Sequence, residues 1–386
     1  MQQKHSSKYL SKIPESIFST MSRLAYENNA VNLGQGFPDF DGPDWIKDEA
    51  YKAMREGKNQ YAPMPGIFSL RKAIRDYQEK FYGLEWDHET EITVTAGATE
   101  ALFAAITAFI DTGDEAIMFE PFYDSHQANV IINGGTPRYV TLKKPDFSFD
   151  ADELLSKIND RTKLIIINSP HNPTGKIFSP EEMQIIADAA IEHDLIVISD
   201  EVYEFLTFDD NKHIPIANID GMRNRTITIS STGKTFGMTG WKIGFAIASP
   251  ELTESIRKVH QFSTYAVNTP AQHSMAAAFG RLEEYLPGFR ADYSRKRDIL
   301  YNALNGTNFR PHLPGGSYFM MADLPEGMFA DDEEAALKLV KDHGIATIPP
   351  SYFYAESAEG KTMLRLCFAK QDESLYNAIE ILKSVF

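Results

Sequence analysis

The feature that most constrains the fold is a regular alternation of short β-rich runs with helical patterns between about residues 91 and 247. The runs are EITVTAG, EAIMFEP, TPRYVTL, KLIIINSP, LIVISDE, TITISST and WKIGFAIA. Apolar runs of this kind predict a mostly parallel, doubly wound sheet with helices on both faces. Between two runs, Ser179, Pro180 and Glu182 supply an N-cap, a first-turn proline and a capping-box acid, which predict a helix start. The fold class is therefore expected to be α/β.

A chain of 386 residues is too long for one small core, so we expect two α/β domains with a cleft between them. Residues 271–306 look largely helical, with a break near Pro287. The tail then alternates a helix (DEEAALKLVKDHG), strand-like IATIPP and MLRLCFA, and a last helix from about Glu373. The expected division is an N-terminal arm and helix (1–30) that joins the small domain, a large domain (31–275) and a small C-terminal domain (276–386).

Charge and composition disfavour several classes of protein. The chain has 38 basic and 54 acidic residues, a formal charge of −16, which disfavours nucleic acid and anionic membranes as partners. No apolar run approaches the ~18 residues of a membrane helix, and the N-terminus does not resemble a secretory signal. We therefore expect a cytoplasmic protein. The single cysteine, Cys367, lies in MLRLCFA and is predicted to be a buried strand residue.

Four segments with polar or small residues fall at predicted strand ends, where ligands collect in open α/β sheets. In the first, TAGATE, Gly97 permits a tight turn, and the amides of Ala98 and Thr99 could face a phosphate at a helix start. An ordinary strand-to-helix turn remains an alternative. In the second, HNPTG, Asn172 could donate its amide to a phenolate oxygen, whereas the alternative is a simple proline turn.

The third and fourth segments carry ionisable groups. In SDEVY, Asp200 ends a buried strand and could face a protonated pyridine nitrogen, with Tyr203 donating to a ring oxygen. A helix-capping aspartate is the alternative. In SSTGKTFGMTGWKIG, the amine of Lys234 could be desolvated enough to attack an aldehyde, and Ser231 and Lys242 could complete a phosphate site. Most lysines are instead solvated surface residues.

These segments, in this order and at these separations, resemble the fold-type I, class I aminotransferases, which depend on pyridoxal 5′-phosphate (PLP). The resemblance extends through VNLGQGFPDF, NQYAP, EPFYDSH, PGGSYF and LRLCFAK and covers nearly the whole chain. It is strongest to the subgroup of kynurenine (glutamine) aminotransferases and bacterial methionine aminotransferases. The resemblance implies the fold-type I architecture, with PLP bound by the large domain.

The resemblance also implies residue roles. Lys234 is expected to be the Schiff-base lysine and general acid/base, Asp200 the partner of the pyridine nitrogen, and Asn172 and Tyr203 ligands of the ring oxygen. The remaining cofactor-binding residues are Gly97, Ala98, Thr99, Ser231 and Lys242 around the phosphate, Tyr123 stacked on the ring, and Tyr61. Lys242 stands where many relatives have arginine. Tyr61 resembles the tyrosine that reaches the neighbouring subunit's cofactor, which implies a homodimer with shared active sites.

The implied substrates are an L-amino acid and a 2-oxo acid, exchanged by a ping-pong mechanism. Arg365, helped by Gly36 and Asn172, is expected to bind the substrate α-carboxylate. Phe18 and Tyr265 align with pocket aromatics of the resembling subgroup, which suits apolar and thioether side chains. Methionine is the first choice of donor, followed by aromatic amino acids, kynurenine and glutamine. No arginine for a distal carboxylate is evident.

Other functions are weighed against this hypothesis. A cysteine-S-conjugate β-lyase would use the same PLP site, and the sequence leaves it open. A PLP-binding regulator would need a DNA-binding segment, which we do not expect in this acidic chain. The nearest glycine cluster, GQGFPD, lacks the third glycine and following helix of a nicotinamide site. No metal-ligand spacing or serine-hydrolase motif is present, so no metal is expected.

Overall fold

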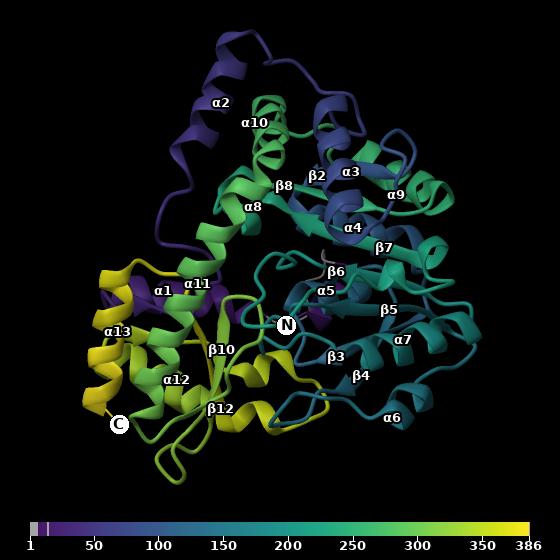
Figure 1. The fold of residues 1–386 in the computed structure, drawn as a ribbon. Coiled ribbons are helices and arrows are strands. Elements are labelled where there is room, and N and C mark those ends of the chain that lie inside the picture. Colours follow the sequence, from purple (N-terminus) through teal and green to yellow (C-terminus); the bar gives the residue numbers. More distant parts are fainter. Residues whose placement is uncertain (1–6, 14, 386) are drawn as a thin grey trace.

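A seven-stranded sheet forms the centre of the computed structural model, which describes residues 7–13 and 15–385 (Figure 1). Its strand order is β2-β8-β7-β6-β5-β3-β4. The strands are β2 (Ile92–Ala96), β3 (Glu115–Glu120), β4 (Thr136–Thr141), β5 (Thr162–Asn168), β6 (Ile196–Asp200), β7 (Thr226–Ser231) and β8 (Ile243–Ile247). Only β8 runs antiparallel to its neighbours, β2 and β7. The prediction of a mostly parallel sheet is confirmed, and each of the seven β-rich runs forms a strand.

Helices cover both faces of this sheet because successive strand residues point to opposite sides. In β5, Ile165 and Ile167 pack in one apolar cluster with Ile186 of α7 (Pro180–Glu192). Leu164 and Ile166 pack in another with residues of α4 (Gly97–Phe109). The other helices of this part are α3 (Phe68–Tyr82), α5 (Asp124–Ile132), α6 (Ala151–Ser156), α8 (Thr232–Thr235) and α9 (Pro250–Ser263). The capping box that starts α7 is present as predicted.

The C-terminal part builds a smaller antiparallel sheet, β12-β10-β9. Its elements are α10 (Thr269–Gly280), α11 (Leu282–Asn305), β9 (Arg310–Pro311), β10 (Phe319–Asp323), α12 (Asp332–Asp342), β11 (Ile345–Ala346), β12 (Met363–Cys367) and α13 (Asp372–Val385). The predicted helix break near Pro287 is wrong, because α11 runs through Pro287. The break lies at Arg281, which ends α10 and caps the start of α11. Pro287 is the sixth residue of α11, beyond the N–H groups that lack an intrahelical acceptor, so the helix continues through it with one hydrogen bond fewer.

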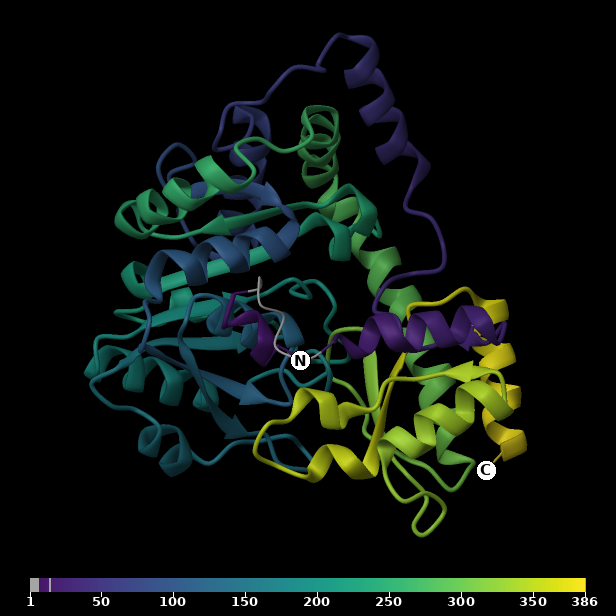
Figure 2. The ribbon, with the colours of Figure 1, turned by 180° about the vertical axis from the view of Figure 1, so that it is seen from behind.

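The N-terminal helix lies with these C-terminal elements (Figures 1 and 2). Helix α1 (Ile17–Glu27) packs against β11 and α12, and the next strand, β1 (Val31–Asn32), pairs in parallel with β11. Helix α2 (Asp44–Arg55) projects at the top of Figure 1 and packs against α10. Residues 1–6 and 14 of the expected arm lie outside the described residues.

Two further observations concern burial and helix length. Cys367 is fully buried in β12, as the sequence predicted. Among the residues that the structure describes, no helix combines the length and the apolar character needed to cross a membrane.

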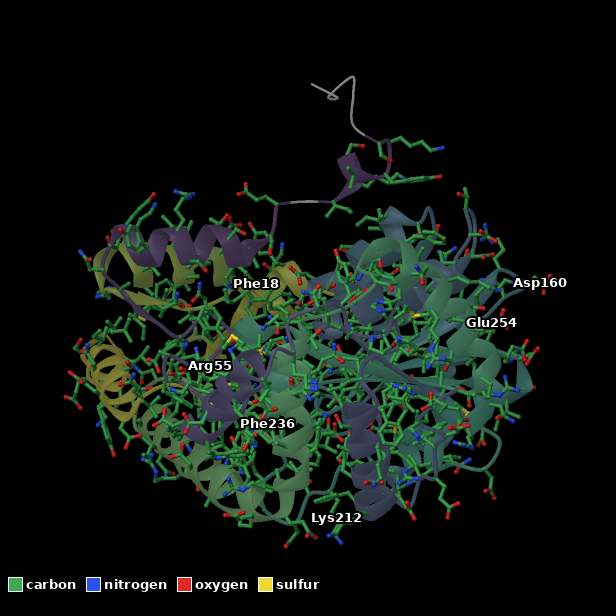
Figure 3. The ribbon with its side chains drawn as sticks, turned by 90° about the horizontal axis from the view of Figure 1, so that it is seen from above. Phe18, Arg55, Asp160, Lys212, Phe236 and Glu254 are labelled. Carbon is green, nitrogen blue, oxygen red and sulfur yellow. The ribbon has the colours of Figure 1, made fainter. Side chains whose placement is uncertain are left out.

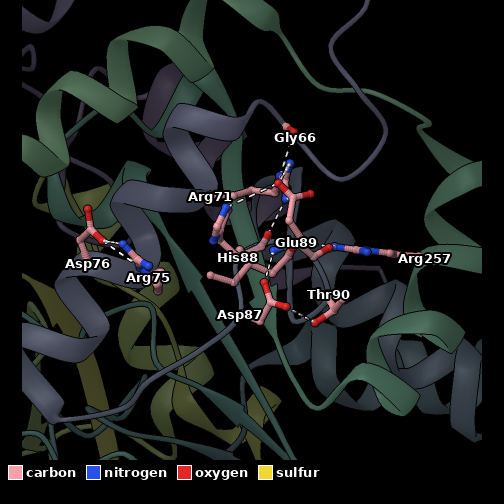
Figure 4. Close-up of polar contacts among 10 residues, drawn as sticks. Gly66, Arg71, Arg75, Asp76, Asp87, His88, Glu89, Thr90 and Arg257 are labelled. Carbon is pink, nitrogen blue, oxygen red and sulfur yellow. Dashed lines mark hydrogen bonds and ion pairs between the residues drawn. The ribbon is translucent and has the colours of Figure 1, made fainter.

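Two arginines fix the turn that leads into β2 (Figure 4). Arg71 of α3 donates to the Gly66 carbonyl at 3.1 Å and pairs with the Glu89 carboxylate at 3.0 Å. Arg257 of α9 donates to the carbonyls of Glu89 at 2.9 Å and Ile92 at 2.8 Å. The turn is therefore tied to both helices, and this sets the position of β2, whose other end leads into the site described below.

Glu115, at the start of β3, supplies a stability test. Arg138 donates to both of its carboxylate oxygens at 2.7 Å, and Arg161 lies 2.5 Å away. The hydrogen bond from Arg138 lowers the Glu115 pKa to about 2. Because the charged form is favoured in the fold, its stabilisation is complete above the ordinary carboxylate pKa and is lost as the pH falls towards about 2.

We expect Glu115→Gln to lower the free energy of unfolding by about 2 kcal/mol at pH 7. The difference from wild type should shrink steadily as the pH falls from about 5 towards 2. Urea unfolding at a series of pH values measures it. Glu254→Gln, which removes an exposed carboxylate paired with Lys258, is the control and should change little. A difference for Glu115→Gln that does not depend on pH would contradict the assignment.

Candidate functional site

A cavity of about 610 Å³ lies where the strands β2, β5, β6 and β7 end and where α1, β10 and β12 approach them. Most residues singled out from the sequence line it: Phe18, Gly36, Gly97, Ala98, Thr99, Tyr123, Asn172, Asp200, Tyr203, Ser231, Lys234, Lys242 and Arg365. In Figure 3, Phe18 lies on α1, on the side that faces the rest of the molecule. The structure thus brings together residues that are up to about 350 positions apart in the chain.

One part of the cavity is built to hold an anion. Helix α4 begins at Gly97, which has a φ of +72°, and its preceding residue provides no side-chain cap. The first N–H groups of α4 are therefore available to a ligand. Lys242 donates from Nζ to the Thr99 hydroxyl at 3.0 Å, which brings a positive charge to the same turn. Gly244 allows β8 to lie close to the start of α4. A Cβ at this position would lie 2.4 Å from the Gly97 carbonyl carbon and 2.5 Å from the Ala98 nitrogen.

Another part of the cavity is organised around the buried carboxylate of Asp200. His126 of α5 donates from Nε2 to Asp200 Oδ2 at 3.0 Å, and both side chains are almost fully buried. Asn168, at the end of β5, donates to the Asp200 carbonyl at 2.8 Å and accepts from the Asn172 backbone N–H at 2.7 Å. His126 and Asn168 therefore orient two of the predicted site residues. Neither was predicted as a site residue, although His126 stands in EPFYDSH and Asn168 in KLIIINSP.

Lys234 presents an amine inside the cavity. Its Nζ donates to the Tyr318 hydroxyl at 2.7 Å and to the Gly36 carbonyl at 3.0 Å, and it lies 5.7 Å from the centre of the Tyr203 ring. Burial disfavours the ammonium form and lowers the pKa of Lys234 to about 8. More of the amine is therefore neutral near physiological pH than in an exposed lysine, and the neutral amine is the form that attacks a carbonyl.

Arg365 is a fully buried cation, and only part of its guanidinium group is hydrogen-bonded within the chain. It donates to Asn172 Oδ1 at 3.0 Å and to the Gly34 carbonyl at 2.6 Å, while Nε has no hydrogen-bond partner among the described residues. The Phe319 ring centre lies 4.2 Å from the guanidinium carbon, and burial lowers the Arg365 pKa to about 10. A buried cation without a carboxylate is costly. Within the part of the chain that the structure describes, none pairs with Arg365, so this site suits an anionic ligand.

Two predicted residues do not line the cavity. Tyr61 and Tyr265 contact each other, with ring centres 5.7 Å apart in an edge-to-face arrangement. They are 84% and 40% exposed. Tyr265 lies two residues after the end of α9 and has a φ of +67°. Within one chain the structure therefore separates these tyrosines from Arg365 and Lys234.

The cavity thus combines four features: a helix start with a lysine, a buried carboxylate, an amine of lowered pKa and a guanidinium without a carboxylate. An aromatic aldehyde with a phosphate group could use the first three, because its phosphate would meet the helix start and its carbonyl the amine. The guanidinium would remain for a carboxylate. This arrangement fits a cofactor and a second, carboxylate-bearing molecule in one site.

Comparison with known proteins finds relatives over nearly the whole chain. The sequence model of the family described as "Aminotransferase class I and II" matches residues 28–382. A methionine aminotransferase of Escherichia coli is 41% identical over 97% of this chain and 98% of the relative. A kynurenine–oxoglutarate transaminase of Dictyostelium discoideum is 38% identical over 96% and 94%. The solved structure of a Mycobacterium tuberculosis N-succinyldiaminopimelate aminotransferase has a TM-score of 0.96 at 40% identity, covering 99% of this chain and 100% of that one.

Proposed function

The chain belongs to the class I and II aminotransferase family and is an aminotransferase, and on this premise we propose that it moves the amino group of L-methionine to a 2-oxo acid. The proposal includes PLP in the cavity, held covalently through Lys234. It rests above all on Lys234, whose lowered pKa gives a nucleophilic amine inside the cavity. Arg365 supports it, as a buried cation with an unpartnered Nε.

The residues of the cavity fit this cofactor. The α4 start, with Thr99, Ser231 and Lys242, would hold the phosphate. Asp200 would keep the ring nitrogen protonated, and Asn172, Tyr203 and Tyr123 would hold the ring and its oxygen. When bound, PLP supplies an aldehyde that bonds to amines and a ring that withdraws electron density from the substrate α-carbon.

In this proposal the side chains have distinct tasks. Arg365 binds the α-carboxylate with its fork, and the Gly36 backbone helps to orient it. Lys234 Nζ would take the proton from the α-carbon, hold it and later release it, so it would act first as a base and then as an acid. One cavity serves both substrates, which predicts ping-pong kinetics: the first 2-oxo acid leaves before the second one binds.

The lining of the cavity supports an apolar donor. Phe18, Leu102, Tyr123 and Phe319 contribute apolar surface, which suits the thioether of methionine. The lysines and the arginine among the described lining residues are Lys234, Lys242 and Arg365, and each has a task above. No lysine or arginine among the described lining residues is left to bind a second carboxylate on the substrate, which argues against dicarboxylic donors. One relative is nevertheless named as a probable N-succinyldiaminopimelate aminotransferase. Aromatic amino acids, kynurenine and glutamine are proposed as weaker donors, because apolar pockets discriminate them poorly.

We also propose a homodimer in which Tyr61 completes the site of the neighbouring subunit. Its 84% exposure leaves the side chain available to a second chain, and aromatic residues are enriched at protein–protein interfaces. Tyr265, in contact with Tyr61, would belong to the same interface. The domain limits 1–30, 31–275 and 276–386 remain part of this proposal, as does a cytoplasmic location.

The test is a half-reaction followed by absorbance. Purified protein loaded with PLP should show a visible band, and L-methionine without any 2-oxo acid should remove it and release one 2-oxo acid per site. A 2-oxo acid should then restore the band, and D-methionine is the control. A chain that retains no PLP would contradict the cofactor, whereas a response to other amino acids but not to methionine would contradict the preference. Pyruvate release from a cysteine conjugate without an acceptor would favour the β-lyase alternative.

A further inference from the structure

Tyr318, just before β10, has no task in the proposal above, yet it contacts the reactive amine. The side chain is buried, and its hydroxyl donates to the Gly36 carbonyl at 2.5 Å. Lys234 Nζ donates to the same hydroxyl at 2.7 Å and to the same carbonyl at 3.0 Å. Amine, phenol and carbonyl therefore form a closed triangle of hydrogen bonds on the cavity wall.

The roles of donor and acceptor in this triangle are determined by chemistry. A phenol has one hydroxyl hydrogen, and the hydroxyl hydrogen of Tyr318 is donated to the Gly36 carbonyl. Its lone pairs are left to accept from the amine of Lys234. Because a hydrogen bond from an ammonium is stronger than one from a neutral amine, this contact favours the protonated form and opposes the effect of burial.

The position of the Tyr318 hydroxyl is fixed by packing. The Tyr203 ring meets the Tyr318 ring edge-on, with centres 5.0 Å apart, and the Phe319 ring lies 4.8 Å away. On another side the Tyr293 ring stacks at 6.2 Å. A lysine side chain is a flexible four-carbon chain, so its amine can take many positions. The acceptor is therefore rigid, whereas the group that it holds is flexible.

We propose that Tyr318 is a positioning residue for Lys234: with the Gly36 carbonyl it holds the amine whenever that amine is not bonded to the cofactor. The inference rests on the proposed function, in which the incoming amino acid releases Lys234 from PLP. Without the hydroxyl, the freed amine would sample many conformations, and fewer of them would place Nζ next to the α-carbon. Tyr318 would then raise kcat without contacting the substrate.

Tyr293 provides a matched control within the same cluster. It is also a buried tyrosine, but its hydroxyl has no hydrogen-bond partner among the described residues. Tyr293→Phe and Tyr318→Phe therefore remove the same atom from neighbouring rings, and only the second change removes a contact with Lys234. A general effect of losing a buried hydroxyl would appear in both variants.

The first measurement follows the amine directly. The full-length enzyme carrying pyridoxamine phosphate, in which Lys234 is free, is treated with an amine-reactive reagent across a range of pH, and the modified peptide is quantified by mass spectrometry. For Tyr318→Phe we expect the pKa of Lys234 to fall by about one unit, because the ammonium loses a charge-assisted hydrogen bond. Tyr293→Phe should leave the labelling profile unchanged.

The second measurement is steady-state kinetics with L-methionine. Tyr318→Phe is expected to lower kcat by about 10-fold or more and to leave KM within about twofold, since the hydroxyl does not contact the substrate. If Tyr318→Phe matches Tyr293→Phe in both the labelling profile and kcat, the proposal is overturned. Failure of the wild type to bind PLP would instead count against the proposed function, and labelling of the cofactor-free chain would then decide the Tyr318–Lys234 contact.

Discussion

Replacing Lys234 with alanine is expected to lower kcat for transamination of L-methionine by about 10⁴-fold or more. In the proposed function the change removes both the group that attaches the cofactor and the base that takes the α-proton, and positioned acid/base groups alone contribute ~10²–10⁴-fold. The variant should still bind PLP through the start of α4, Lys242 and Asp200, because those contacts do not involve Lys234. Stopped-flow absorbance after mixing with L-methionine measures the half-reaction.

Stability gives a second signature of the same change. Burial disfavours the Lys234 ammonium and lowers its pKa to about 8, so relief of this burial cost should offset the loss of the hydrogen bonds to Tyr318 and the Gly36 carbonyl. The unfolding midpoint of Lys234→Ala is therefore expected to be close to that of the wild type. Lys212→Ala, which removes an exposed lysine labelled in Figure 3, is the control and should keep full activity. More than about one per cent residual kcat in Lys234→Ala would mean that another group moves the proton.

The strands and the residues at their ends could be predicted because they depend on local pattern. Seven apolar runs formed the seven strands of the sheet, and residues that follow directly from strand ends, such as Asp200 and Lys234, met in one cavity. The helix break was mispredicted because a proline is a strong local signal, whereas Arg281 carries none. That break depends on how α10 and α11 pack, which a single sequence does not reveal.

The supporting groups could not be predicted because they meet only through the fold. His126 reaches Asp200 across 74 positions of the chain, and Tyr318 reaches Lys234 across 84. Nothing in the pattern around either residue distinguishes it from an ordinary core aromatic. Desolvation of the Lys234 amine was expected from its place at a strand end, but the segments that bury it and lower its pKa meet only in the fold. In the proposed homodimer Tyr61 and Tyr265 would meet a second chain, and in the single chain both side chains are exposed.

Arg365→Lys is expected to lower kcat/KM for L-methionine by about 10²-fold, mainly through KM. Lysine keeps the positive charge, but it lacks the planar fork that binds a carboxylate with two parallel hydrogen bonds. It also loses the contacts that the guanidinium makes with Asn172 Oδ1 and with the Phe319 ring. Steady-state kinetics with methionine and a saturating 2-oxo acid measures the change. Arg55→Lys, at an exposed position labelled in Figure 3, is the control.

A substrate without a carboxylate separates binding from folding in this experiment. 3-(Methylthio)propylamine has the side chain and amine of methionine, and the wild type should use it poorly because Arg365 has nothing to bind. Arg365→Lys should lower the rate with this amine little further, so the two losses should not add. Equal additional losses with methionine and with the amine would mean that Arg365 supports the shape of the cavity and does not bind the carboxylate. Because Nε of Arg365 has no partner among the described residues and is free for a ligand, we expect the larger loss with methionine.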